Sequence, residues 1–158
     1  AGNKIDQAIA DYIKKTFNLA IGERTAEEVK IKIGAAVPFE EELRVTIKGR
    51  DFIQGLPRSA QVGTNEIVKA IDGELKQIIK AIKTVLADTP PELASDIIDH
   101  GIIMTGGSSQ LRNLADLVYR KTGVKASLAE DSLYCVAKGT GIVLEHLDMY
   151  KKTVLSKK

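Results

Sequence analysis

Residues 102–109 read Ile-Ile-Met-Thr-Gly-Gly-Ser-Ser, and this stretch decides the fold class. A short unbroken apolar run is typical of a buried strand. Two adjacent glycines then permit a tight turn, and apolar residues at 111, 114 and 117 predict a helix after it. A second short apolar segment, 124–128, follows that helix. The sequence therefore predicts an α/β domain whose core contains a parallel strand pair, 102–105 with 124–128.

Upstream of this stretch the sequence predicts helices with one interruption. Apolar residues at helical spacing indicate a first helix from Ile5 to Phe17. Thr25 and Glu28 have the spacing of a capping box, which predicts that a second helix starts there and ends near residue 34. From residue 40 the apolar period shortens to two, which predicts a strand, and a second short strand is expected at 59–62.

The longest predicted helix follows these strands, with an apolar stripe from residue 67 to residue 86. Thr89 and Glu92 form a second candidate capping box after it. We therefore divide the chain into a core, 1–34 and 86–158, and a small inserted α+β subdomain, 35–85. Two predicted core strands are fewer than the ~4–6 of a typical sheet. Either further strands are unrecognised or the chain is a piece of something larger.

Composition narrows the class of protein. The 158 residues are 44% hydrophobic, which suits one folded domain. The 23 Lys and Arg nearly balance the 21 Asp and Glu, which argues against a nucleic-acid partner. The single cysteine, Cys135, excludes an internal disulfide and fits a reducing, cytoplasmic setting. No apolar run approaches the ~18 residues of a membrane-spanning helix, and there is no pattern of a signal peptide.

Two features could bind a ligand. The turn Gly106-Gly107-Ser108-Ser109 lets a ligand approach the backbone, and the helix start after it favours an anion such as a nucleotide phosphate. On the local sequence alone, a tight turn with a serine cap explains these four residues better than a ligand site does. Glu27 and Glu28 open a helix, where acids are favoured, and capping explains Glu28. Glu27 could instead accept hydrogen bonds from a ribose diol, although a solvated acid is the simpler interpretation.

No catalytic or metal site is expected. His100 and His146 have no acidic or cysteine companions at metal-ligand spacing. Cys135 lies beside Val136 on an apolar helix face without a nearby histidine, which favours packing over reactivity.

Several segments resemble, in order and at consistent spacing, the second-domain signatures of MreB, the bacterial actin family. The most specific are Glu-Arg-Thr-Ala-Glu at 23–27 and Pro-Pro-Glu-Leu-Ala at 90–94. The other matching segments lie at 1–9, 18–31, 49–51, 55–57, 90–97, 103–107 and 129–131. The resemblance spans the chain from Ala1 to about Met149 and implies part of an actin-like (ribonuclease H-like) domain.

The resemblance implies a protein that binds ATP, forms filaments by self-association and organises cell shape and cell-wall synthesis. In the family, the base and ribose lie in a crevice between the two halves of the second domain. The matching residues here are Ala26, Glu27, Glu28 and Val29 on one wall and Gly106, Gly107, Ser108 and Ser109 on the other. Ser108 replaces a third glycine of the family, and Asn3 stands where the family often has Asp.

The resemblance also implies that some functional parts of the family lie outside this chain. The family's first domain and its phosphate-binding hairpins would precede Ala1, together with the residues that hold Mg²⁺ and the segment that contacts the membrane. The expected location is therefore cytoplasmic, with membrane association only through the parts outside this chain. We expect the parent protein to hydrolyse ATP and this chain alone not to.

Two alternatives stay open at this point. A chaperone or sugar-kinase relative shares the fold and uses its nucleotide clamp for domain closure. A stand-alone interaction module would instead present its long isoleucine-rich helix to a partner.

Overall fold

The computed structural model describes residues 2–155, of which 152–155 are described by their backbone alone. In chain order the elements are α1 (Gly2–Phe17), β1 (Leu19–Ala20), α2 (Glu23–Ile33), β2 (Arg44–Asp51), β3 (Pro57–Gly63), α3 (Thr64–Ala87), α4 (Pro91–His100), β4 (Ile102–Met104), the 3₁₀ turn η1 (Gly107–Gln110), α5 (Leu114–Thr122), β5 (Ala126–Leu128), α6 (Cys135–Glu145) and α7 (Leu147–Leu155).

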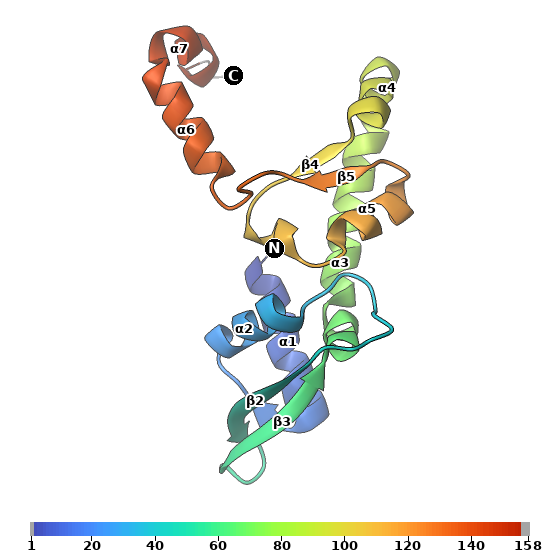
Figure 1. The fold of residues 1–158 in the computed structure, drawn as a ribbon, viewed down its shortest axis with the longest axis vertical. Coiled ribbons are helices and arrows are strands. Elements are labelled where there is room, and N and C mark those ends of the chain that lie inside the picture. Colours follow the sequence, from blue (N-terminus) through green and yellow to red (C-terminus); the bar gives the residue numbers. More distant parts are fainter. Residues whose placement is uncertain (1, 156–158) are drawn as a thin grey trace.

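The hydrophobic core lies where α1, α2 and the first half of α3 meet a small antiparallel sheet. The sheet has the order β1-β2-β3, with Ile47 opposite Ala60 and Leu19 opposite Asp51. Figure 1 shows the two blue helices and the hairpin gathered around the lower end of α3. The fully buried side chains here include Ile5, Ile9, Ile13, Leu19, Val62, Ile67 and Ile71. Their burial supplies most of the apolar stabilisation of the chain.

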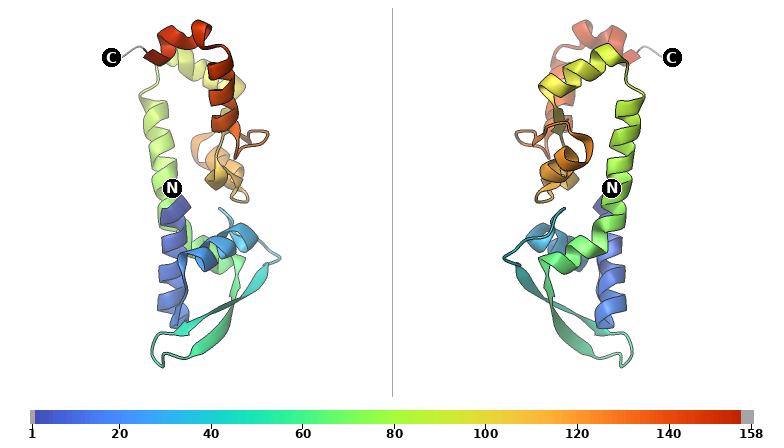
Figure 2. Two further views of the ribbon diagram at one scale, coloured as in Figure 1. Left: turned by 90° about the vertical axis from the view of Figure 1, so that its left-hand side faces the viewer. Right: turned by 90° about the vertical axis from the view of Figure 1, so that its right-hand side faces the viewer.

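Helix α3 connects this core to the second half of the chain. Its 24 residues advance about 36 Å at 1.5 Å per residue, and the helix runs along one side of the molecule (Figure 2). Helix α5 packs beside α3, and α4 follows the end of α3 and leads into the parallel pair β4 and β5, in which Ile102 is opposite Ala126. Helices α6 and α7 extend away from this pair (Figure 1) and leave large apolar side chains exposed. Within residues 2–155, no helix is both long and apolar enough to cross a membrane.

The main secondary-structure predictions are confirmed. The structure contains the first helix, the hairpin, the long helix and the parallel strand pair. The division into 1–34 with 86–158 and an inserted 35–85 stays a prediction. In the described residues, α1 and α2 share one hydrophobic cluster with the hairpin and α3.

Both predicted capping boxes are wrong. Helix α2 begins two residues before Thr25, with Gly22 as its N-cap and no side-chain cap. Helix α4 begins at Pro91, after Pro90, and the Thr89 hydroxyl instead donates to the carbonyl oxygen of Val85 at 2.7 Å. The predicted helix directly after the glycine turn is also interrupted, because η1 and residues 111–113 separate the turn from α5.

Candidate functional site

A cavity of about 160 Å³ lies where α1, α2 and the glycine turn meet. Its lining residues are Ile5, Lys30, Ile31, Gly34, Gly107, Ser108, Gln110, Leu111 and Arg112. Gly107 and Ser108 thus lie against helix α2. The turn and this helix are the two segments that the sequence analysis names as the walls of a site. A larger cavity between α3 and α5 contains none of the sequence-predicted site residues.

One face of α2 forms the first wall. Lys30, Ile31 and Gly34 follow Glu27 at intervals of three, four and seven residues, so all four positions share one face of α2 or its end. Glu27 is exposed and lies one turn before the lining residues. Ile31 is 67% exposed, so this wall offers apolar surface that the described residues leave largely uncovered.

An ion pair with α1 fixes the position of Lys30, the cation of this wall. The Lys30 ammonium contacts both carboxylate oxygens of Asp6 on α1, at 2.8 and 2.9 Å. Both side chains are largely buried, and a buried charge needs such a partner. The ion pair therefore holds the ammonium at the edge of the cavity in one position.

The glycine turn forms the second wall. Gly106 has a φ of +85°, a conformation that glycine adopts at little cost, and its N–H donates to the carbonyl oxygen of Ser132 at 2.7 Å. Ser109 is buried, and both its N–H and its hydroxyl donate to the carbonyl oxygen of Gly106. The Ser108 hydroxyl lies against the start of α1, 3.3 Å from where a Cβ on Gly2 would be. Gly106 and Ser109 thus shape the turn, while Gly107 and Ser108 line the cavity.

Two residues hold the walls together. A Cβ on Gly34 would lie 2.3 Å from the carbonyl oxygen of Lys30 and 3.0 Å from Cδ1 of Leu111, so only glycine fits there. Arg112 donates from Nη1 to the carbonyl oxygen of Lys32 at 2.8 Å. A guanidinium at the end of α2 satisfies carbonyl groups that the helix leaves free. These contacts tie the end of α2 to the segment after the turn.

The remaining predicted residues lie away from the cavity. Ala26 and Val29 are buried in the core under α2. Glu28 pairs with Arg24 at 3.5 Å and with Lys32 at 3.8 Å, and it faces β2 rather than the turn. A binding role for these three residues stays a prediction. Glu27, not Glu28, is the acid on the face of α2 that lines the cavity.

The predicted site residues did not include the other seven lining residues, of which Ile5 was expected only as an apolar residue of the first helix. Lys30, Ile31 and Gly34 could have been found by continuing the helical face from Glu27. Gln110, Leu111 and Arg112 follow the turn, but no local pattern distinguishes them from an ordinary connection.

The lining groups suit binding rather than proton transfer. They include two cations, a hydroxyl, a side-chain amide and apolar surface, but neither a carboxylate nor an imidazole. A flat, partly apolar ring system with polar edges matches such a cavity. Among the described residues, no three His, Cys, Asp or Glu side chains gather in a way that could hold a metal ion.

Comparison with known proteins gives a consistent result. The family model described as MreB/Mbl protein matches residues 1–152. The cell shape-determining protein Mbl of Bacillus cereus is 44% identical over 155 residues, which are 98% of this chain and 46% of that protein. The chain thus spans about half the length of the curated relatives it matches.

Two solved structures resemble the fold. The crystal structure of MreB 5 of Spiroplasma citri bound to AMPPNP has a TM-score of 0.90 and 36% identity, covering 98% of this chain and 46% of that one. A MamK double helical filament has a TM-score of 0.70 and 24% identity, covering 85% of this chain and 41% of that one. The second likeness concerns the fold alone.

Proposed function

Because this chain belongs to the MreB/Mbl family, we propose that it supplies the base and ribose walls of the ATP site in a filament-forming protein that determines cell shape. The fold is part of an actin-like domain, as in the MreB 5 structure. Support for the function comes from the Mbl relative, which is named cell shape-determining, and from MreB 5, which was solved with AMPPNP. The family match favours this function over the chaperone, sugar-kinase and interaction-module alternatives.

One observation carries the proposal: the cavity between α2 and the glycine turn. We assign the base to this cavity, with its apolar face against Ile31 and its polar edge toward the backbone of Gly107 and the hydroxyl of Ser108. The ribose then lies toward Glu27, one turn before Ile31 on the same helix face. A carboxylate there accepts hydrogen bonds from both hydroxyls of the diol.

Other parts of the proposal concern the whole protein. We assign the phosphates and Mg²⁺ to parts of the protein outside this chain, since the chain spans about half of its relatives. We also propose self-association into filaments, contacts with cell-wall synthesis and morphogenesis proteins, and a cytoplasmic location with membrane association through the rest of the protein. These follow from the family resemblance.

A nucleotide titration tests the ribose assignment. In the full-length protein that carries this sequence, Glu27→Gln should weaken ATP binding about tenfold, because a hydrogen bond to a charged group contributes about 1.5–3 kcal/mol and tenfold corresponds to ~1.4 kcal/mol. The same variant should change the affinity for 2′-deoxy-ATP less, since one hydroxyl partner is already missing. Calorimetry measures both.

Glu28→Gln tests the alternative that the neighbouring acid holds the ribose, because Glu28 follows Glu27 directly but pairs with Arg24 and Lys32. It should leave both affinities within about twofold. An unchanged ATP affinity in Glu27→Gln, or an equal loss in Glu28→Gln, would show that the ribose is not held as proposed.

A further inference from the structure

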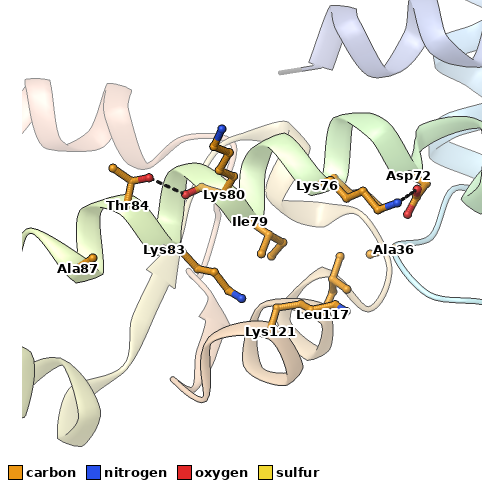
Figure 3. Close-up of a pocket in the computed structure, with 11 residues that line it drawn as sticks. Ala36, Asp72, Lys76, Ile79, Lys80, Lys83, Thr84, Ala87, Leu117 and Lys121 are labelled. Atoms are coloured by element: carbon orange, nitrogen blue, oxygen red, sulfur yellow. Dashed lines mark hydrogen bonds and ion pairs between the residues drawn. The ribbon is translucent and has the colours of Figure 1, made fainter.

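A second, larger cavity of about 540 Å³ lies between α3 and α5 and is separate from the proposed nucleotide site. Figure 3 shows it from the side, with α3 above and α5 below. Its lining residues are Ala36, Asp72, Leu75, Lys76, Ile79, Lys80, Lys83, Thr84, Ala87, Leu117 and Lys121. It shares no lining residue with the smaller cavity. Its volume falls within the range of sites that hold small molecules, about 300–1,000 Å³.

The floor of this cavity is apolar. Leu75 and Ile79 lie one turn apart on the inner face of α3, and both are buried. In Figure 3 the Ile79 side chain points from α3 toward Leu117 of α5. Ala36 closes the end nearest the hydrophobic core. The floor therefore runs lengthwise along α3, between the two helices.

The rim of the cavity is strongly cationic. Four lysines line it, against one acid, Asp72. Asp72 already forms an ion pair within α3, because its Oδ2 lies 2.6 Å from the ammonium of Lys76. Lys83 extends from α3 toward the side where Lys121 of α5 lies, whereas Lys80 points the other way (Figure 3). No carboxylate among the side chains that the structure describes forms an ion pair with Lys83 or Lys121.

We propose that this cavity binds an anionic amphiphile, an elongated apolar body with a carboxylate or phosphate head. The head lies between Lys83 and Lys121, one ammonium from each helix, where opposite charge compensates both. The body lies along Leu75 and Ile79. The lining residues of α3 span 72–87, about 22 Å along the helix axis, which suits a chain-like ligand better than a compact one.

Such a ligand contacts both α3 and α5. Ala36 at the inner end of the cavity donates its N–H to the carbonyl oxygen of Arg112 at 2.8 Å, and Arg112 lines the nucleotide cavity. The amphiphile site is therefore adjacent to the hydrogen bond that connects the residues after α2 to the residues after the glycine turn. Binding should raise the melting temperature, because a ligand that binds only the folded state stabilises it.

Calorimetric titration with dodecanoate, below its micelle concentration, tests the proposal in the full-length protein that carries this sequence. We expect one saturable site, and an affinity that falls as salt is raised because the head-group attraction is screened. Lys83→Glu combined with Lys121→Glu should weaken binding at least about tenfold, which corresponds to ~1.4 kcal/mol. Dodecyltrimethylammonium, with the same chain and a cationic head, should bind the unchanged protein at least tenfold more weakly than dodecanoate.

Lys69→Glu is the matched control, because Lys69 is exposed on α3 but lines no part of this cavity. It should leave dodecanoate binding within about twofold, and all variants should keep the helical circular dichroism of the unchanged protein. The proposal is overturned if dodecanoate shows no saturable binding, as when another part of the protein fills the cavity. It is equally overturned if the cationic amphiphile binds as well, or if Lys69→Glu weakens binding as much as the double reversal.

Discussion

The Lys30 ammonium on α2 lies 2.8 Å from Oδ1 and 2.9 Å from Oδ2 of Asp6 on α1. The two side chains are only 16% and 12% exposed, so each depends on the other for compensation of its charge. The pair joins α1 and α2, two of the helices around the core, and also fixes one of the two cations that line the proposed nucleotide site. Folding stability and ligand binding therefore depend on the same contact.

Asp6→Asn should lower the free energy of unfolding by about 2 kcal/mol, because removing one partner leaves a largely buried ammonium without its counter-charge. Urea denaturation of the chain measures the loss. The control is Asp72→Asn, which breaks the exposed pair with Lys76. That change should cost no more than about 0.5 kcal/mol, since exposed ion pairs contribute little. Equal losses in the two variants would contradict the role assigned to burial.

Long periodic patterns could be predicted from the sequence, and contacts between distant segments could not. The apolar stripe of α3 and the alternation in β2 each extend over many residues, and both predictions are confirmed. Strand β1 has two residues and exists only because Leu19 and Ala20 pair with Asp51 and Arg50 of β2. No local periodicity can reveal so short an element, because tertiary pairing decides it.

The site shows the same limit. The glycine turn could be singled out from its local motif and Glu27 from a first-turn acid that capping leaves unexplained, and a binding role for both stays a prediction. Arg112 could not be singled out, because its role depends on the carbonyl oxygens of α2, some eighty residues earlier in the chain. The predicted caps at Thr25 and Thr89 were wrong for a related reason. A capping box is two residues at a fixed spacing, and the longer helical segments around them begin elsewhere.

Gly34→Ala should destabilise the chain by about 1–3 kcal/mol, because its Cβ would lie 2.3 Å from the carbonyl oxygen of Lys30 and press on Leu111. It should also weaken ATP binding, since the walls of the cavity must separate. Gly73→Ala is the matched control in α3, where a Cβ meets nothing within 4 Å. That change should stabilise the chain by about 0.5–1 kcal/mol through helix propensity. Thermal and urea denaturation measure both, and the opposite signs make the comparison decisive.

Asp51 should make stability depend on pH in the acidic range. The backbone N–H groups of Gln54 and Ile53 donate to its Oδ1 at 2.8 Å each, and Arg58 lies beside it, so the pKa of the carboxyl is held below its ordinary value. A group with a lowered folded pKa contributes stability above its unfolded pKa, about 3.9, and that contribution is lost as the pH falls through the folded value.

Asp51→Asn keeps an oxygen that can accept the two N–H bonds but removes the titration. The stability difference between the unchanged chain and this variant should be constant from about pH 6 to 8 and should shrink below about pH 4. Urea denaturation at a series of pH values measures it. Ile47→Val on β2 removes no titrating group and is the control, so its stability difference should stay the same at every pH. A difference that grows as the pH falls would reverse the sign of the argument.

The 158-residue chain alone should bind adenosine about as well as the full-length protein does, but ATP far more weakly. We assign the base and ribose walls to this chain and the phosphate contacts to other parts of the protein. Losing two or three hydrogen bonds to charged phosphates removes on the order of 4 kcal/mol, about a thousandfold in affinity. Paired calorimetric titrations of both proteins with both ligands measure the contrast. A micromolar ATP affinity in the isolated chain would mean that the chain itself contains phosphate-binding groups. If the isolated chain bound neither adenosine nor ATP, the walls of the cavity would not form without the rest of the protein.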